Sequence, residues 1–483
     1  MRTHINETKN KVDETVELFG WVHNRRDHGK LIFIDLRDRS GVVQVVFVPQ
    51  QKDYEVASTL RSEWVVKIIG KVAERPEKMV NADIETGKIE IQPESLEVLS
   101  QSETPPFPLD TDGREIDEEV RLKYRYLDLR RERLQRNITL RSKFVDASRQ
   151  FLFKKGFLEI ETPILSAPTP EGSRDFVVPS RLNSGKFFAL PQSPQQYKQL
   201  LMVAGFEKYF QIARCFRDED LRADRGFEHT QIDMEMSFVN QADVMALDEE
   251  LITEVVESLG YKIKQKPFPV LTYQESMDKY GADKFDLRDE EDKKNGVLAY
   301  AWVKDFPFFE KVKDEGPASR KASQATSSPA LRSSEGAKKW TFTHNPFSMA
   351  KPEHVEWLME GKNIDQILTT QYDLVCNGVE VGGGSVRAHK PEMLKAVFKI
   401  MGYSEDSIKS QFGHMLEAFK FGAPPHGGIA HGIERNLMTL LGEDYLREVV
   451  AFPQTSSGRT SVMDAPSGLE DKQVKELGLK IKS

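Results

Sequence analysis

The first hundred residues contain five short runs of apolar and β-branched side chains. Gly, Asp and Arg residues separate these runs, and runs of this length and composition are typical of β-strands. Five strands in so short a stretch predict a small barrel. An OB-fold is the natural candidate, because it binds single-stranded nucleic acid across an open face. The runs are residues 16–22, 31–36, 42–48, 65–72 and 88–98.

One of these runs carries a side chain that could stack on a base. In residues 31–36 the aliphatic side chains share one side of the strand, and Phe33 lies on the other. An aromatic side chain taken alone is more often part of a core, so stacking and core packing both stay open. Gln44 lies on the next run, and Arg25 and Arg26 are expected in the loop before residue 31.

Composition divides the chain into a barrel, a linker and a larger C-terminal domain. Residues 99–120 are rich in Pro, Asp and Glu, which is typical of a linker. We therefore predict a barrel domain over 1–100, a hinge over 101–135 and a second domain over 136–483. Residues 315–339 are rich in Ser, Ala and Pro with almost no large apolar side chain, so we predict a disordered insertion there.

Residues 121–155 combine a helical pattern with a basic composition. Between Arg121 and Arg149, ten Lys and Arg residues stand against three acidic residues. Such a run indicates either a solvated helix face or a patch for RNA, and both interpretations stay open. The segment GFLEIETPIL that follows predicts a strand ending at Pro163.

Two apolar runs in the middle of the chain predict an antiparallel hairpin. They are residues 209–217 and 229–238, and the polar loop 218–228 lies between them. Alternation along the second run separates a core side from a polar side that could line a pocket. The core side is Ile232, Met234, Met236 and Phe238, and the polar side is His229, Gln231, Asp233 and Glu235.

Candidate groups for phosphate binding lie at the ends of the predicted strands. Arg217 ends the first strand of the hairpin, where its guanidinium could hold a phosphate through two hydrogen bonds. The glycine run in GVEVGGGSVR lets a ligand approach the backbone, but no Gly-Lys-Ser/Thr follows, so it is not a Walker A loop. Asp373 and Glu380 would suit Mg²⁺ facing a triphosphate, and Arg435 supplies a second cation.

Composition and charge exclude several classes of protein. The chain has 483 residues, 39% of them hydrophobic and 30% charged, and no run long enough to cross a bilayer. The N-terminus lacks the apolar stretch of a secretory signal, so we expect a cytoplasmic protein without a membrane partner. The two cysteines, Cys215 and Cys376, are far apart in sequence and are expected to be reduced and buried rather than zinc ligands.

Three of these segments together resemble a known family. GFLEIETP ending at Pro163, FRDED at 216–220 and GIER at 432–435 resemble motifs 1, 2 and 3 of the class II aminoacyl-tRNA synthetases, in the right order. Neither HIGH nor KMSKS occurs, so class I has no support. The remaining segments are similar to aspartyl-tRNA synthetases of bacterial type: RLKYRYLDLRR at 121–131, ALPQSPQQYKQLL at 189–201, RADR at 222–225, TQID at 230–233 and EVGGGSVRAH at 380–389.

The resemblance implies a fold, substrates and partners. The fold would be α+β, with an N-terminal OB-fold β-barrel and a class II catalytic domain whose antiparallel sheet is flanked by helices. ATP, Mg²⁺ and L-aspartate would be bound, aspartate would be transferred to tRNA(Asp), and motif 1 would make the protein a homodimer. Asparaginyl- and lysyl-tRNA synthetases are disfavoured by the pair Lys198 and Arg387, and a catalytically silent RNA-binding paralogue is disfavoured because the residues expected for catalysis are present.

The resemblance also implies a role for individual residues. The catalytic residues would be Arg217 on the α-phosphate, Glu219 on the adenine amine and Arg435 on the γ-phosphate, with Asp373 and Glu380 holding Mg²⁺. Further ATP contacts would come from Asp218, Gly226, His229, Glu380, Gly432, Ile433 and Glu434. Aspartate would contact Glu171, Ser193, Gln195, Lys198, Arg217, Gln231, Asp233, His344 and Arg387. The anticodon would contact Arg25, Arg26, His28, Phe33, Gln44, Lys78 and Glu90.

Several positions depart from the family pattern. The segment 286–307 runs straight through the place where bacterial relatives carry a large extra domain. His229 replaces the aromatic residue, commonly Phe, that stacks on adenine. Gly226 replaces a frequent Gln, and Asn345 follows His344 where a second His is common.

Two residues give opposite indications about the tRNA. Relatives that also charge tRNA(Asn) tend to carry His at the position of His28, whereas they often carry Gly at the position of Lys78. We favour the relaxed specificity that His28 indicates. It would imply an amidotransferase partner that converts Asp-tRNA(Asn).

Overall fold

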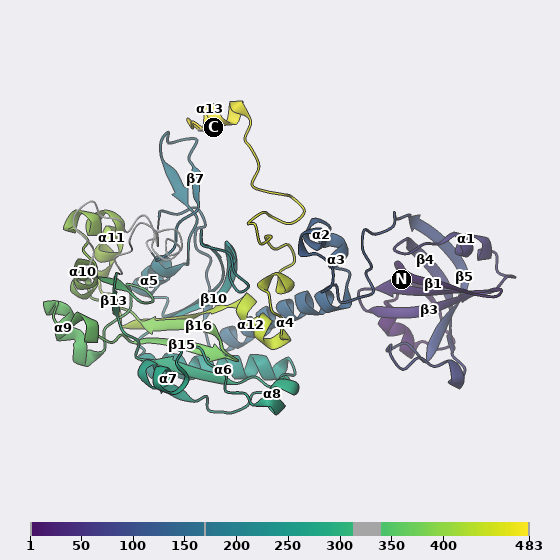
Figure 1. The fold of residues 1–483 in the computed structure, drawn as a ribbon, viewed down its shortest axis with the longest axis horizontal. Helices are drawn as coiled ribbons and strands as arrows, with labels where there is room; N and C mark the ends of the chain where they lie inside the picture. Colours follow the sequence, from purple (N-terminus) through teal and green to yellow (C-terminus); the bar gives the residue numbers. More distant parts are fainter. Residues whose placement is uncertain (1, 169–170, 313–339, 482–483) are drawn as a thin grey trace. The chain divides into compact units, whose positions relative to one another are not determined.

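A computed structural model describes residues 2–168, 171–312 and 340–481. The chain separates into two compact units, one built from the residues up to Asp117 with Tyr126–Gln135, the other from Glu118–Arg125 with the residues from Arg136 onward. Figure 1 shows the elements of both units. The insertion predicted at 315–339 lies outside the described residues.

The first unit is a closed five-stranded barrel, as predicted. The strands follow the order β1-β2-β3-β5-β4 around the barrel, and alternate apolar side chains fill its interior. Three short helices accompany them: η1 (Ile5–Asn10), α1 (Tyr54–Thr59) and η2 (Glu77–Met79). The strands are β1 (Thr15–His28), β2 (Leu31–Asp38), β3 (Gly41–Phe47), β4 (Val65–Glu74) and β5 (Ile89–Ser100).

The first strand is longer than its apolar pattern predicted. Arg25 and Arg26 were expected in a loop, but both lie on β1, opposite Ile34 and Phe33 of β2. The register shifts between Val22 and Asn24, which marks a β-bulge. Past the bulge the side chains are polar because this end of the strand faces solvent, so the alternation that reveals a strand is lost.

The second unit is built on an eight-stranded, mostly antiparallel sheet. Its order is β11-β12-β15-β16-β17-β10-β9-β6, and only β11–β12 and β6–β9 pair in parallel. The predicted hairpin is present as β9 and β10. The strands are β6 (Leu158–Glu159), β9 (Lys208–Phe216), β10 (Glu228–Ser237), β11 (Val270–Thr272), β12 (Tyr300–Lys304), β15 (Gln371–Cys376), β16 (Val379–Val386) and β17 (His426–Gly432).

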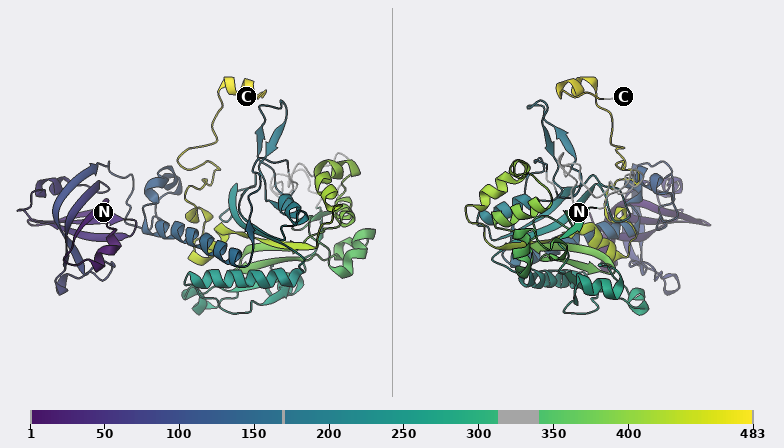
Figure 2. Two further views of the ribbon diagram at one scale, coloured as in Figure 1. Left: turned by 180° about the vertical axis from the view of Figure 1, so that it is seen from behind. Right: turned by 60° about the vertical axis from the view of Figure 1, so that its left-hand side comes forward.

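Two long helices, α4 (Glu132–Lys154) and α6 (Gln241–Ser258), pack on one face of this sheet through a single hydrophobic core. Figure 2 shows α6 beneath the sheet in both of its views. The opposite face is left for the cavity described below. The helix α3 (Arg125–Asp128) belongs to the first unit except for Arg125. The smaller helices of the second unit include α2 (Glu118–Lys123), α5 (Gln195–Val203), α7 (Tyr273–Tyr280), α8 (Glu290–Lys294), α12 (Ile433–Leu441), η7 (Leu446–Val449) and α13 (Asp471–Glu476).

A second hydrophobic cluster lies beside the main core and joins α10 (Pro391–Ile400) and α11 (Glu405–Phe419) to two short strands. Phe347 and Phe398 lie in it, and Phe398 stacks on Phe412 at 3.9 Å between ring centroids. The remaining elements are α9 (Val355–Glu360), η5 (Pro352–His354), η6 (Ile364–Gln366), β7 (Val177–Pro179), β8 (Phe187–Ala189), β13 (Phe309–Lys311) and β14 (Trp340–Phe342).

Two predictions for this unit were wrong in detail. Phe238 was expected in the core, but β10 ends at Ser237, and Phe238 turns outward with φ +61° and 68% of its surface exposed. The strand predicted up to Pro163 is reduced to Leu158–Glu159. Proline cannot donate to a β-ladder, so the pairing with β9 does not continue to that residue.

The most buried arginines of the basic run after residue 121 belong neither to a solvated helix face nor to an open patch for RNA. Arg121, Arg125 and Arg131 are 1–5% exposed. Arg121 forms a two-pronged ion pair with Glu448, with N–O distances of 3.1 and 2.9 Å. Arg125 donates to three backbone carbonyls. These arginines tie chain segments together, because a buried guanidinium needs an acceptor for each of its donors.

Cys215 and Cys376 are free and buried, as predicted. None of the helices in the described residues is long and apolar enough to cross a membrane.

Candidate active site

A cavity of about 350 Å³ opens on the sheet face opposite α4 and α6. Strand alternation builds its floor: Gln231 and Asp233 of β10 line the cavity, whereas Ile232 and Met234 point into the core. Strands β16 and β17, helices α5 and α12 and the polar loop between β9 and β10 supply most of the rest of the lining.

Two cations and two carboxylates form a buried network at one end of the cavity. Nζ of Lys198 is 2.8 Å from Oδ2 of Asp233 and 3.3 Å from Oε2 of Glu235. Arg387 donates to both oxygens of Glu235, at 2.9 and 3.0 Å. All four residues are at most 2% exposed. Buried charges are tolerated when each is paired in this way, and the four charges sum to zero.

The two carboxyl groups of this network titrate differently. Burial by itself raises the pKa of Glu235, but Arg387 and Lys198 outweigh burial and bring it to about 2. Burial is the largest influence on Asp233, and its pKa stays raised despite Lys198. Oδ1 of Asp233 is buried and has no hydrogen-bond partner among the described residues. A site therefore remains on this carboxyl group for a donor from a ligand.

Glu171 provides a second acceptor of the same kind. Its Oε2 accepts a hydrogen bond from Oγ of Ser193 at 2.5 Å, and within the described chain its buried Oε1 has no partner. Burial raises the pKa of Glu171 to about 7. Ser193 also accepts a hydrogen bond from the backbone N–H of Gln195, which lines the cavity at the start of α5.

Arg217 follows β9 and points into the cavity, as the sequence predicted. Its backbone is fixed by a 2.8 Å hydrogen bond from its N–H to the carbonyl oxygen of Phe227. Its Nε is buried and unpartnered within the described part of the chain. The neighbouring Glu219 pairs with Oγ of Ser173 and lies 3.6 Å from Arg225. An unsatisfied buried guanidinium donor favours an anionic ligand at this end.

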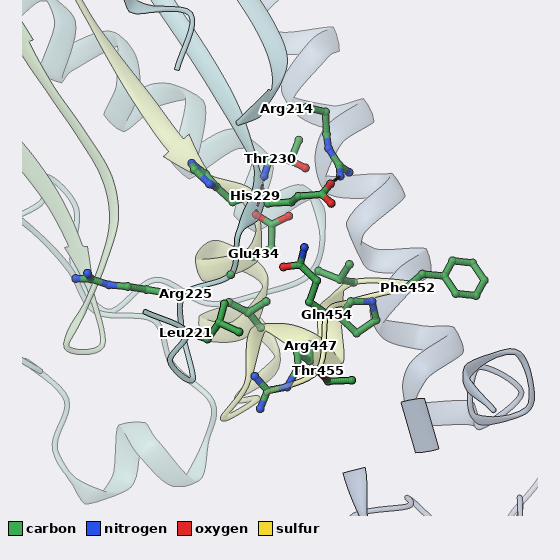
Figure 3. A pocket seen from close by; sticks show the side chains of 15 residues that line it. Arg214, Leu221, Arg225, His229, Thr230, Glu434, Arg447, Phe452, Gln454 and Thr455 are labelled. Carbon is green, nitrogen blue, oxygen red and sulfur yellow. Dashed lines mark hydrogen bonds and ion pairs between the residues drawn. The ribbon is translucent and has the colours of Figure 1, made fainter. Parts of the chain in front are cut away.

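A small second cavity of about 50 Å³ adjoins the main one at His229 (Figure 3). Gly226 and His229 line both cavities, and Gln454 lines the small one. Oε1 of Gln454 accepts a hydrogen bond from the N–H of Phe227 at 3.1 Å, so the C-terminal segment helps to hold the polar loop. Burial, reinforced by Arg217, lowers the pKa of His229 well below its usual range, so the ring is neutral.

Asp373 and Glu380 face each other across β15 and β16, where the sequence predicted a divalent cation. A Cβ on Gly383 would lie 3.0 Å from Oδ1 of Asp373 and 3.6 Å from Oε1 of Glu380, so the glycine keeps the space between the carboxylates open. Among the described residues no three His, Cys, Asp or Glu side chains converge on a metal site. Mg²⁺ is usually held by one or two carboxylates together with phosphate oxygens of the substrate, rather than by protein groups alone. Two carboxylates with room for phosphate oxygens between them fit this pattern.

Cations surround these carboxylates. Nζ of Lys284 is 2.8 Å from Oε2 of Glu380, and NH1 of Arg435 is 3.7 Å from the same oxygen. Burial by itself raises the pKa of Glu380, but Lys284 and Arg435 outweigh it and bring the pKa to about 2. His344 lies 3.2 Å from Oδ2 of Asp373; burial opposes its charged form, yet Asp373 raises its pKa above the usual value.

The junction of β17 and α12 holds the last group of predicted residues. Gly432, Glu434 and Arg435 line the cavity, whereas the Ile433 side chain is buried in the core. Glu434 accepts hydrogen bonds from Arg141 at 2.8 Å and from the N–H of Thr230 at 3.0 Å. Its carboxylate therefore ties α4 and β10 to the start of α12. Asp218, also predicted for ATP, lies 3.4 Å from Arg174 and is not part of the lining.

The residues predicted to read the anticodon lie on the barrel. The rings of His28 and Phe33 meet edge to face at 5.8 Å between centroids. Phe33 is half-buried and lies outside the barrel core, so the core interpretation of this side chain was wrong. Nε2 of Gln44 is 3.3 Å from Oε2 of Glu90, and Lys78 is exposed on η2.

Some residues of the cavity were not anticipated. Glu235 was placed on the polar side of β10, but its two-pronged contact with Arg387 depends on a partner 152 residues away. Lys284 lies in none of the quoted motifs, and Asp224, which lies in the RADR segment, was given no role; Asp224 lies 3.0 Å from Arg435. The only available signal was the alternation that places Glu235 beside Asp233.

Two family models match the chain. The model described as tRNA synthetases class II (D, K and N) matches residues 117–456, and the model described as OB-fold nucleic acid binding domain matches residues 16–99. The first covers more than half of the chain, and the second coincides with the barrel.

Curated relatives align with the chain over nearly its whole length. The aspartate–tRNA ligase of Staphylococcus saprophyticus is 39% identical over 98% of this chain and 98% of its own. The aspartate–tRNA(Asp/Asn) ligase of a Thermoanaerobacter species is 41% identical over 99% and 98%. The first alignment runs over 579 positions against 483 residues here, so at least 96 positions of that relative have no counterpart. This difference agrees with the predicted lack of the extra domain.

Solved structures of similar fold include the Pyrococcus horikoshii asparaginyl-tRNA synthetase bound to asparaginyl-adenylate. It has a TM-score of 0.71, 21% identity and coverage of 94% of this chain and 98% of its own. The Entamoeba histolytica aspartyl-tRNA synthetase also has a TM-score of 0.71, with 21% identity and coverage of 94% and 91%. The solved structures show the shared fold, and the family models with the curated relatives establish that this chain belongs to the aspartate–tRNA ligase family of class II aminoacyl-tRNA synthetases.

Proposed function

We propose that the chain activates L-aspartate with ATP to form aspartyl-adenylate and transfers the aspartate to the 3′ end of tRNA(Asp). The observation that carries this proposal is a set of three buried polar atoms on the cavity wall that have no partner among the residues the structure describes: Oε1 of Glu171, Oδ1 of Asp233 and Nε of Arg217. Two acceptors suit an ammonium group and one donor suits a phosphate, and such atoms are costly to leave unsatisfied.

Lys198 and Arg387 support aspartate over its amide. Together with Asp233 and Glu235 they form a set of four charges that sum to zero, and the ammonium of the substrate would pair with Asp233 and Glu171. Asp233 would then no longer compensate Lys198, and the side-chain carboxylate of aspartate would supply the missing negative charge. An asparagine amide would leave one buried cation poorly compensated, which costs more than the loss of a methylene contact. A lysine substrate would bring a third cation beside these two. Ser193, Gln195, Gln231 and His344 complete this end of the cavity.

ATP would bind toward Arg217 and Arg435. Arg217 would stabilise the charge that develops on the α-phosphate as the aspartate carboxylate attacks, and Arg435 would hold the γ-phosphate. Glu219 would accept from the adenine amine, and His229 would stack on the ring in its neutral form. Asp373 and Glu380 would hold Mg²⁺, which when bound would neutralise part of the phosphate charge.

The barrel is proposed to bind the anticodon, with Phe33 stacking on a base and Lys78 contacting a phosphate. Arg25 and Arg26 pair with Asp27 and Asp35 and would exchange these partners for phosphates when tRNA binds. We favour charging of tRNA(Asn) as well as tRNA(Asp) on the basis of His28, with an amidotransferase acting afterwards. The relatives carry both kinds of name, so they support either specificity.

We further propose a homodimer in the cytoplasm, where tRNA is charged. Apolar side chains in and near the motif 1 segment support the dimer, because Phe153, Leu158, Ile164 and Leu165 are 47–54% exposed. Exposed apolar patches of this kind mark protein–protein interfaces.

The test is aspartylation of purified tRNA(Asp) and tRNA(Asn) transcripts with ATP, Mg²⁺ and labelled amino acid. Charging of tRNA(Asp) with aspartate, but with neither asparagine nor lysine, is the expected result. Charging with asparagine or lysine would contradict the role given to Lys198 and Arg387. Charging with none of the three would favour the silent paralogue.

A further inference from the structure

Lys284 lies between α7 and α8 and reaches the wall of the active-site cavity from outside the three class II motifs. Its Nζ is 2.8 Å from Oε2 of Glu380, and the two side chains are 39% and 27% exposed. The ion pair is therefore half-buried and borders the space left open by Gly383.

The backbone that carries Lys284 is fixed on the sheet. The next residue, Phe285, is 6% exposed, packs in a cluster with Val303 and Val375, and stacks on Tyr280 at 4.3 Å. On the other side Asp286 lies against the turn between β15 and β16, where a Cβ on Gly378 would be 3.9 Å from the Cβ of Asp286. Only the four-carbon side chain of Lys284 is free to change its position.

Cationic groups flank both carboxylates: Lys284 and Arg435 lie beside Glu380, and His344 lies beside Asp373. A divalent cation on Glu380 would be the third cation at one carboxylate and would add two positive charges. Of the contacts that Glu380 makes, the one with Lys284 would then be the least favourable. The reason is that a strongly hydrated ammonium gains more from a nearby phosphate oxygen than from a carboxylate that it shares with other cations.

We propose that Lys284 changes partner when ATP binds, and that its Nζ then binds an oxygen of the diphosphate end of ATP. This inference rests on the proposed function. It makes Lys284 a second cation, beside Arg435, for the negative charge that grows on the diphosphate as the bond to the α-phosphate breaks. No covalent bond to Lys284 forms or breaks.

The experiment compares Lys284→Met with Lys293→Met. Lys293 is on α8 in the same segment, and its amine pairs with the exposed Glu290 at 2.7 Å, so it is a matched control. Binding of ATP with Mg²⁺, of diphosphate with Mg²⁺ and of AMP is measured by calorimetry without aspartate, so that no turnover occurs.

For Lys284→Met we expect about tenfold to hundredfold weaker binding of ATP and diphosphate. AMP binding and the Lys293→Met variant should stay within about twofold of wild type, and Lys284→Arg should regain most of the ATP affinity.

Two results with the variants would overturn the inference. Equal loss of ATP and AMP binding would mean that Lys284 only supports the fold of the cavity. Unchanged or tighter binding of ATP with Mg²⁺ would mean that Lys284 only occupies the cation position. Failure of the wild-type protein to bind ATP at all would overturn the proposed function itself, and is distinguishable because it needs no variant.

Discussion

Glu171 is half-buried and Glu235 is buried beside the same cavity, yet their pKa values move in opposite directions. Burial raises the pKa of Glu171 to about 7, whereas Arg387 and Lys198 outweigh burial and hold the pKa of Glu235 at about 2. The difference follows from the partners: Glu171 has a hydroxyl group, and Glu235 has two cations. At neutral pH Glu235 is therefore a permanent charge of the network, and Glu171 is the group that a substrate ammonium would ionise.

This difference predicts a pH dependence of aspartate binding. A bound ammonium requires the charged form of Glu171, and with a pKa of about 7 that form is lost as the pH falls. Aspartate affinity, measured by calorimetry between pH 5.5 and 8, should therefore fall by about tenfold per unit below pH 7 and level off above it. The ionisable groups of aspartate do not titrate in this range.

The control for that experiment is Glu171→Gln, which keeps the shape of the side chain and removes its titration. The variant should bind aspartate more weakly than wild type at pH 8 and show a flat profile. A profile that kept its slope in the variant would assign the titration to another group, such as His344.

Arg217 has the clearest expected effect on catalysis. Arg217→Ala removes the buried guanidinium placed to stabilise charge on the α-phosphate, so aspartate-dependent ATP–diphosphate exchange should fall by about a hundredfold to a thousandfold. Binding of tRNA, measured by filter retention, should be nearly unchanged because the anticodon contacts are proposed for the barrel. Near-normal exchange in this variant would show that Arg217 has another role.

At the scale of elements, the glycine strand β16 shows why neighbouring positions differ. A Cβ on Gly384 would lie 2.1 Å from the carbonyl oxygen of Gly428 on β17, and that backbone cannot move away. A Cβ on Gly383 would instead enter the cavity beside Asp373 and Glu380. Adjacent residues thus have separate tasks: Gly384 allows the strands to pack closely, and Gly383 keeps the space between Asp373 and Glu380 open.

This contrast predicts two different variants. Gly384→Ala should lower the free energy of unfolding, measured by urea denaturation, by about 1–3 kcal/mol, the usual cost of overpacking a core. Gly383→Ala should unfold close to wild type but need several times more Mg²⁺ for half-maximal ATP–diphosphate exchange. If both changed stability equally and neither changed the Mg²⁺ requirement, the open space would have no role in metal binding.

The strands could be predicted from the sequence where apolar and polar side chains alternate clearly. The site residues could be predicted where they lie in recognisable motifs. The barrel and the β9–β10 hairpin follow from period-two patterns. The polar end of β1 did not, because its side chains face solvent and carry no alternation. The contacts of the buried Arg121 and Arg125 and of the more exposed Lys284 could not be predicted from the sequence, since their acceptors come from residues distant in sequence. Local pattern determines which face a residue occupies, and tertiary pairing determines what a charge there does.

At the scale of the whole molecule, the two units have separate hydrophobic cores. Residues 104–483, expressed without the barrel, should therefore keep aspartate-dependent ATP–diphosphate exchange within about tenfold of the full chain, because the cavity lies wholly in the second unit. Charging of tRNA by this fragment should fall far more, since the anticodon contacts are lost. Equal loss of both activities would show that the cavity depends on the barrel.

The choice of tRNA is expected to depend on both units, because the anticodon is proposed to bind the barrel and the amino acid is proposed to be attached in the second unit. His28 is exposed and lies edge to face with Phe33, so its ring borders the surface where a base would stack. His28→Leu keeps an apolar contact with Phe33 but removes both ring nitrogens. It should therefore lower charging of tRNA(Asn) by about tenfold, because one specific polar contact is worth about that much discrimination. Charging of tRNA(Asp) should stay nearly unchanged. Using the ratio of the two rates cancels any general loss of activity.

Lys78→Gly is the matched variant and should raise charging of tRNA(Asn) if Lys78 restricts it. Equal ratios in the wild type and both variants would place the discrimination elsewhere on the barrel.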